Sequence, residues 1–152
     1  MTTRPINAPQ SLLAIDFGLR RIGIATAVCL TRTATPLTTL PAVNGEPEWE
    51  KLDRLVNDWQ PDLIVVGLPY NSDGSWSEMG TLAKSFAEKL GDKYRLPVDL
   101  IDERFTSAEA GSLLKEQRRQ GLRNKKLHKE DVDAVAAQLI AESWMNSAAE
   151  RS

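Results

Sequence analysis

Three acidic residues occupy positions where a negative charge needs compensation. Asp16 interrupts the apolar run "LLAIDFGLRRIGIATA" at residues 12–27, Glu103 closes the apolar stretch "DLIDE", and Asp133 lies early in the last helical pattern. An ionised carboxylate taken out of water costs several kcal/mol unless a cation or hydrogen bonds compensate it. These three residues are therefore the first candidates for chemistry.

Helical spacing separates Asp133 from its neighbour Asp131. The residues three, four and seven positions after Asp133 suit close packing on a sheet: Ala136, Ala137 and Ile140. Asp131 instead shares its face with two polar residues, Gln138 and Glu142. The spacing predicts that Asp133 points inward and Asp131 outward.

A cluster of Asp16, Glu103 and Asp133 would repel itself unless cations neutralised it. Carboxylate oxygens favour hard cations, Mg²⁺ or Mn²⁺, over zinc. A pair of such ions can clamp the attacking and leaving oxygens of a phosphodiester during hydrolysis. The three acids thus indicate a metal-dependent phosphodiesterase.

Each acid also has a structural interpretation. Asp16 could form a salt bridge with Arg20 or Arg21, and Asp133 could favour the dipole at a helix N-terminus. Glu103 could be a solvated strand end or pair with Arg104.

These residues must be positioned by strands and helices, which alternate along the chain after an initial β-hairpin. Hydrophobic patterning predicts strands at 12–17, 22–28, 33–40, 62–69 and 96–103. It predicts helices at 47–61, 81–94 (ending near Gly91), 106–119 and 130–145. The first three strands would be antiparallel, with Pro36 keeping the third at an edge, and the later strands parallel. We expect an α/β domain over 11–147, with tails at 1–10 and 148–152.

Local charge is more informative than total charge. The 152-residue chain has a formal net charge of -2, but residues 115–129 contain seven basic residues and one acidic residue. The segment could be a solvated face, yet its place directly before the helix of Asp133 favours a nucleic-acid contact.

A single cysteine excludes an intramolecular disulfide, and without a signal-like or membrane-spanning segment we expect a cytoplasmic protein.

Four sequence blocks together resemble one known family. They read "IDFGLRRIGIA" (15–25), "IVVGLPYNSDGSWSE" (64–78), "DERFTSAEA" (102–110) and "DVDAVAAQLI" (131–140). In this order they resemble the pre-16S rRNA nucleases, also called YqgF-type or Holliday-junction-resolvase-like proteins. The resemblance implies a ribonuclease H-like mixed five-stranded sheet with helices on both faces.

The same resemblance assigns roles to individual residues. Asp16, Glu103 and Asp133 match the acids that would bind Mg²⁺ or Mn²⁺ in this family, and Arg21 and Arg104 match its basic positions. The candidate nucleic-acid contacts are Arg20, Arg21, Asn71, Arg104, Arg118, Arg119, Arg123, Lys125 and Lys126. Turn formation by "NSDG" is an alternative role for Asn71.

Several functions are compatible with these features. The first is a metal-dependent nuclease that trims structured RNA, by resemblance the 5′ end of pre-16S rRNA, with ribosomal particles as partners. A Holliday-junction resolvase acting on branched DNA is the second, and a non-enzymatic, transcription-associated nucleic-acid-binding factor the third. The pattern DFGxxxxG at residues 16–23 also resembles the phosphate hairpin of actin-like ATPases, which need two such domains. We expect a monomer or a weak homodimer.

Overall fold

The computed structural model describes residues 10–69, 75, 77–102 and 129–151. Its strands are β1 (Ser11–Asp16), β2 (Arg21–Val28), β3 (Thr33–Val43), β4 (Glu46–Pro47), β5 (Leu63–Leu68) and β6 (Val98–Asp102). Its helices in these ranges are α1 (Trp49–Trp59), α2 (Glu78–Tyr94) and α4 (Lys129–Arg151). None of these described helices has the length and apolar character needed to cross a membrane.

The strands form one mixed sheet in the order β4-β3-β2-β1-β5-β6. The β1–β2 and β2–β3 pairs are antiparallel, whereas β1–β5 and β5–β6 are parallel. This arrangement confirms the predicted α/β class. The predicted count of five strands is one too low, because the chain turns back at Gly45 (φ 83°) and the two-residue β4 pairs with Ala42 and Val43.

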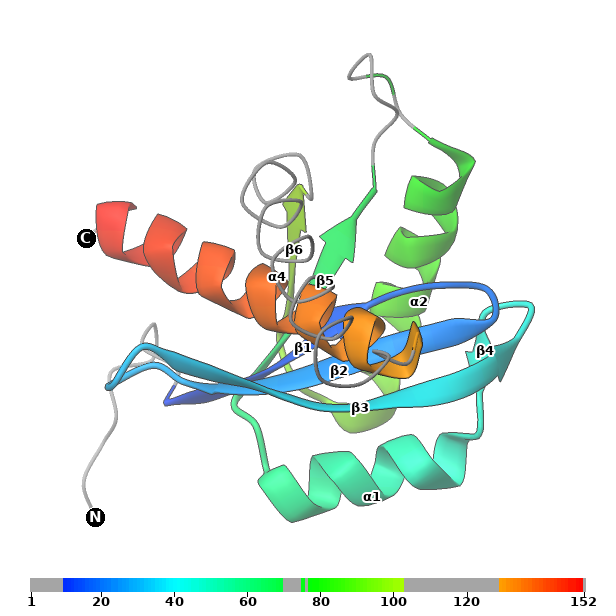
Figure 1. Ribbon diagram of the computed structural model, residues 1–152, viewed down its shortest axis with the longest axis horizontal. Coiled ribbons are helices and arrows are strands. Elements are labelled where there is room, and N and C mark those ends of the chain that lie inside the picture. The colour runs from blue at the N-terminus through cyan, green and yellow to red at the C-terminus, as the bar shows by residue number, and fades with distance from the viewer. Residues whose placement is uncertain (1–9, 70–74, 76, 103–128, 152) are drawn as a thin grey trace, which may run out of the picture.

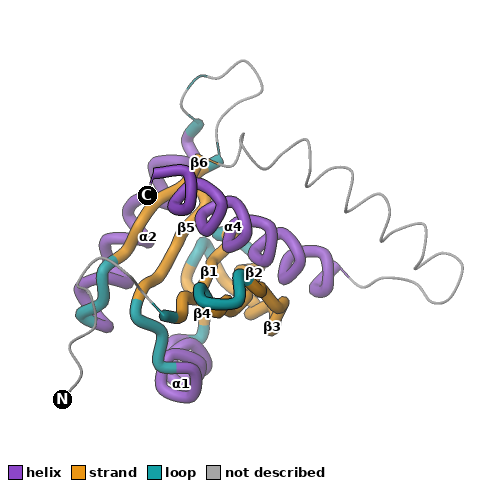
Figure 2. The backbone as a smooth tube through the Cα atoms, turned by 90° about the vertical axis from the view of Figure 1, so that its left-hand side faces the viewer, coloured by secondary structure: helices purple, strands orange, loops and turns teal. Residues whose placement is uncertain are grey.

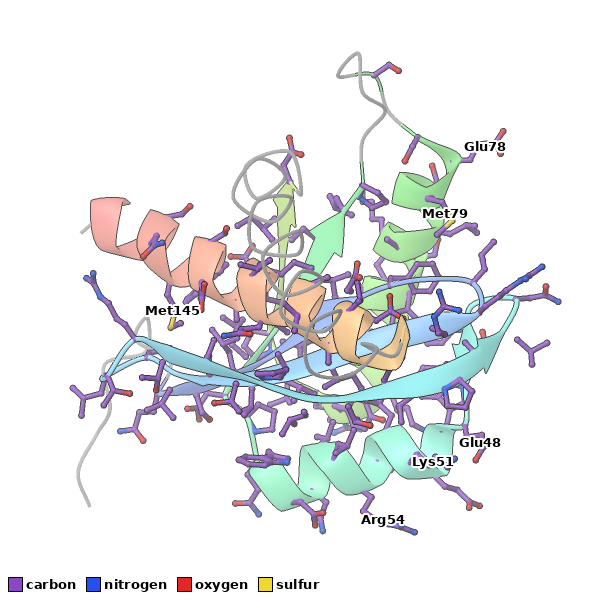
Figure 3. The ribbon with its side chains drawn as sticks, in the orientation of Figure 1. Glu48, Lys51, Arg54, Glu78, Met79 and Met145 are labelled. Atoms are coloured by element: carbon purple, nitrogen blue, oxygen red, sulfur yellow. The ribbon has the colours of Figure 1, made fainter. Side chains whose placement is uncertain are left out.

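Helices cover both faces of the sheet, as Figures 1 and 2 show. Strand alternation sends Leu13 and Ile15 of β1 toward α1 and α2, while Leu12 and Ala14 pack toward α4. Every residue of β5 is buried, as expected for a central strand with helices on both sides. Met145, labelled in Figure 3, is buried between α4 and the sheet.

Two details of the helices differ from the sequence patterns. The spacing of Trp49, Leu52, Leu55, Val56 and Trp59 predicts one buried face of α1. Trp59 is nevertheless 47% exposed because it ends the helix, where Gln60 turns into the left-handed region. Helix α2 continues past Gly91 to Tyr94. A side chain at Gly91 would lie 3.4 Å from Val98 of β6, so this glycine lies at a packing contact within the helix.

A small polar cluster holds β4 against both α1 and α2. Trp49 donates a hydrogen bond from Nε1 to Oε2 of Glu46 (2.9 Å), and Lys89 forms an ion pair with Oε1 of the same carboxylate. Lys93 lies 5.3 Å above the Trp49 ring, within range of a cation–π interaction. The hydrogen bond from Lys89 and that from Trp49 lower the pKa of Glu46.

Glu46→Gln should lower the melting temperature at pH 7 and have little effect near pH 3. The lowered pKa means that the stabilisation is present above the unfolded-state pKa of about 4.3 and disappears as pH falls through the folded-state value. Because the carboxylate is half exposed, the loss should stay within about 1 kcal/mol.

Thermal unfolding at both pH values tests this effect. Glu48→Gln is the control, since it removes the same charge from a more exposed carboxylate, which precedes α1 and pairs with Lys51. A melting-temperature difference that is equal at pH 7 and pH 3 would contradict the assignment.

Candidate active site at the carboxyl edge of the sheet

Asp16 is the last residue of β1 and lies on the face of the sheet that α4 covers. Its strand partner in β2 is Gly23, and paired residues of antiparallel strands present their side chains to the same face. Phe17, the next residue, is buried on the opposite face, with its ring 5.0 Å from that of Phe86. Burial of this ring fixes the strand end from which Asp16 projects.

The turn after Phe17 is tight because Gly18 has no side chain. A Cβ at Gly18 would lie 2.4 Å from the carbonyl oxygen of Arg21, a distance that real Cβ atoms do not reach. The chain therefore reverses within a few residues and brings Arg21 back beside the end of β1. Arg20 is exposed in this turn, and its carbonyl accepts a hydrogen bond from the amide of Ala42 (2.8 Å).

The backbone of α4 touches β2 at Gly23. A Cβ at Gly23 would lie 2.1 Å from the carbonyl oxygen of Asp133 and 2.5 Å from its carbonyl carbon. Gly23 is the strand partner of Asp16. The backbone of Asp133, which rests on Gly23, therefore lies on the same face of the sheet as Asp16, over the neighbouring strand. The structure thus brings together two of the three predicted acids.

Arg21 forms an ion pair with Asp133. Its Nε donates a 2.7 Å hydrogen bond to Oδ2 of the carboxylate, and the two side chains are 42% and 22% exposed, respectively. Charge-assisted contacts of this length are among the stronger hydrogen bonds in proteins. Arg21 is therefore bound to a predicted metal ligand.

The burial of side chains along α4, the helix that carries Asp133, matches the prediction only in part. Ala137 and Ile140 are buried against the sheet and Ala136 is half-buried. Gln138, expected on a wet face, is half-buried and donates from Nε2 to the carbonyl oxygen of Ala34 (3.2 Å). This contact forms because α4 also crosses β3. The side chain of Asp131 lies outside the described residues.

The carboxyl ends of three parallel strands meet at the edge where Asp16 lies. Ile15 pairs with Val66 of β5, and Leu68 of β5 pairs with Asp102 of β6. Ligand sites of open α/β sheets gather at such edges. Asp102 is followed directly by Glu103, which lies outside the described residues.

Most of the predicted nucleic-acid contacts also lie outside the described residues: Asn71, Arg104, Arg118, Arg119, Arg123, Lys125 and Lys126. In the ranges that are described, no group of three or more His, Cys, Asp or Glu side chains is arranged to hold a metal ion. The described part of the site therefore consists of two acids and the two arginines of the β1–β2 turn.

Two residues that position the site were missed in the sequence. Gly23 stands inside a strand, a placement that often marks the close approach of another backbone. Asp99 of β6 accepts a 2.6 Å hydrogen bond from Nε1 of Trp144, which ties β6 to α4. The alternation of Asp99 with Ile101 was a local sign that Asp99 faces the helix.

Solved structures with the same fold are Holliday junction resolvases. T. thermophilus RuvC in complex with a Holliday junction substrate matches with a TM-score of 0.52 at 16% identity, covering 91% of this chain and 97% of that chain. The yeast mitochondrial resolvase Ydc2 matches with a TM-score of 0.53 at 16% identity, covering 91% and 79%. The chain thus has the ribonuclease H-like fold of the resolvases, as predicted.

The family follows from the sequence itself. Residues 10–147 match the RuvX family, described as Holliday junction resolvase, and the chain belongs to this family. A protein of Saccharophagus degradans named "Putative pre-16S rRNA nuclease" is 43% identical over 135 residues, covering 89% of this chain and 92% of the relative. The protein is accordingly a nuclease, a hydrolase acting on ester bonds, and the predicted family is confirmed.

Gly23→Ala should destabilise the protein by about 1–3 kcal/mol, the usual cost of overpacking, since the new methyl group meets the backbone of Asp133. The same change should reduce cleavage, because α4 must move away from β2 and carry Asp133 with it. Urea unfolding and a cleavage assay measure the two effects.

Gly91→Ala is the matched control. Its methyl group would meet only ordinary contacts at 3.4 Å and beyond, and alanine favours a helix by about 0.5–1 kcal/mol over glycine. We expect unchanged cleavage and equal or higher stability for this variant. If Gly23→Ala is as stable as the wild type, the packing of α4 on β2 does not depend on this contact.

Proposed function

We propose that the protein is a divalent-metal-dependent nuclease that cleaves structured RNA, processing the 5′ end of pre-16S rRNA in ribosome biogenesis. The observation that carries the proposal is the contact between Gly23 and the backbone of Asp133, which brings Asp133 beside Asp16. The relatives named as pre-16S rRNA nucleases support the substrate. Such a role implies a cytoplasmic location and contact with ribosomal particles.

The donor set fits Mg²⁺ or Mn²⁺. Asp16 and Asp133 offer carboxylate oxygens on one face, and Asp133 already binds a cation, the Arg21 guanidinium. We assign Glu103, the residue after β6, as the third ligand on the basis of its sequence position. These acids would hold the divalent cation, which would supply Lewis-acid stabilisation during hydrolysis of the phosphodiester.

The protein's own residues position the substrate and the acids. Close packing at Gly23 holds the backbone of Asp133, and the buried ring of Phe17 holds that of Asp16. The exposed Arg20 and Arg21 lie at the same edge and can bind phosphate oxygens. We assign the same role to the remaining basic positions: Arg104, Arg118, Arg119, Arg123, Lys125 and Lys126. Asn71 would contact the substrate beside them.

Cleavage of a Holliday junction is the second candidate. The description of the RuvX family and the resolvase fold favour it. Resolvases cut two strands symmetrically, so this activity would require a dimer. A strictly monomeric protein with no activity on four-way DNA junctions would exclude it.

Asp16→Asn should reduce Mg²⁺-dependent cleavage by at least a hundredfold while preserving the fold. Loss of an outer-shell partner of a metal ligand already costs about 10–100-fold, and Asp16 is proposed as a direct ligand. The assay compares RNA spanning the 5′ end of pre-16S rRNA, unstructured single-stranded RNA and a four-way DNA junction, and circular dichroism checks folding.

Asp58→Asn provides the control, because it makes the same chemical change at an exposed position of α1, on the other face of the sheet. This variant should cleave like the wild type. Equal cleavage by Asp16→Asn, in a preparation free of other nucleases, would overturn the proposed mechanism. Cleavage of the DNA junction alone would favour the resolvase function.

A further inference from the structure

The ion pair between Arg21 and Asp133 joins a movable partner to a fixed one. Asp133 belongs to a long helix whose backbone is in contact with β2, and its side chain is only 22% exposed. Arg21 begins β2 beside an exposed turn, and its side chain is 42% exposed. Of the two, the guanidinium is the group that can leave without moving the fold.

Arg21 also occupies an oxygen that a metal ion would use. Its Nε lies 2.7 Å from Oδ2 of Asp133, which is hydrogen-bonding distance. Two carboxylates that share one face repel each other, and the guanidinium offsets this repulsion while no metal ion is bound. A divalent cation that binds Asp133 must therefore compete with the positive charge of Arg21.

A guanidinium released from Asp133 has a natural second partner. Arginine recognises phosphate with the same planar fork that it presents to carboxylates. The exposed edge occupied by Arg20 and Arg21 is where we place the nucleic-acid backbone. A phosphate at this edge would draw Arg21 away from Asp133 and leave the carboxylate oxygen available.

We propose that Arg21 is a positioning residue that neutralises Asp133 in the free protein and exchanges this carboxylate for a substrate phosphate as the divalent cation binds. The inference rests on the proposed metal-dependent function and adds to it a coupling between the two ligands. By linkage, nucleic acid then tightens metal binding, and the metal tightens nucleic-acid binding by the same factor. The site is thereby completed only when both are present.

Binding of Mn²⁺, measured by calorimetry at one fixed pH, tests the exchange. Free Arg21→Gln protein should bind Mn²⁺ about fivefold or more tightly than the wild type, because the competing cation is gone. Arg21→Lys, which keeps a positive charge, should remain near the wild-type affinity. Arg54→Gln is the control for the loss of a positive charge. It makes the same chemical change at an exposed position of α1, on the other face of the sheet, and should bind Mn²⁺ like the wild type.

A second series adds a short 2′-O-methyl phosphorothioate RNA, which resists cleavage. This RNA should tighten Mn²⁺ binding to the wild type and have much less effect on Arg21→Gln. Equal or weaker Mn²⁺ binding by free Arg21→Gln would overturn the exchange while leaving the metal-dependent nuclease intact. Absence of Mn²⁺ binding in every protein would overturn the proposed metal site and, with it, this inference.

Discussion

The contact between β2 and α4 at Gly23 determines how the rest of the molecule is arranged. Because glycine leaves no side chain between them, the backbone of Asp133 rests directly on the strand that pairs with β1. Small residues continue the close approach along the same face: Ala14, Ala25, Ala27, Ala137 and Ala141. A helix this close to a sheet brings its first turns, and the acid they carry, to the carboxyl edge of the strands.

Strand alternation puts the larger apolar core and the candidate site on opposite faces of the sheet. One face of the sheet carries large apolar side chains that pack on α1 and α2, including Ile15, Phe17 and Ile24. The other face carries alanines beside Leu12, Val65 and Ile101, and it also carries the acids Asp16 and Asp99. Asp16 and Phe17 are neighbours in sequence, yet one belongs to the site and the other anchors the larger core. The site can therefore carry charge because the larger core lies on the opposite face of the sheet.

Features that depend on local periodicity could be predicted from the sequence. Alternation along the first strand puts Asp16 on the same face as Leu12 and Ala14, and helical spacing predicts that Asp133 points inward. The pair between Arg21 and Asp133 joins residues 112 positions apart and depends on how α4 crosses the sheet, which no local pattern reports. Trp59 has the helical spacing of the buried face of α1, but it is the last residue of the helix and is not covered by the sheet. Its predicted burial was therefore wrong. The role of Glu103 remains a prediction.

The position of α4 along the chain has a consequence for synthesis. The six strands that the structure describes all precede α4, and the apolar face formed by Leu12, Val65 and Ile101 is buried against this helix. A nascent chain that has left the ribosome only as far as β6 therefore lacks a cover for this face, and it also lacks Asp133. This face is closed only after α4 has been synthesised, and Asp133 reaches the end of β1 in the same step.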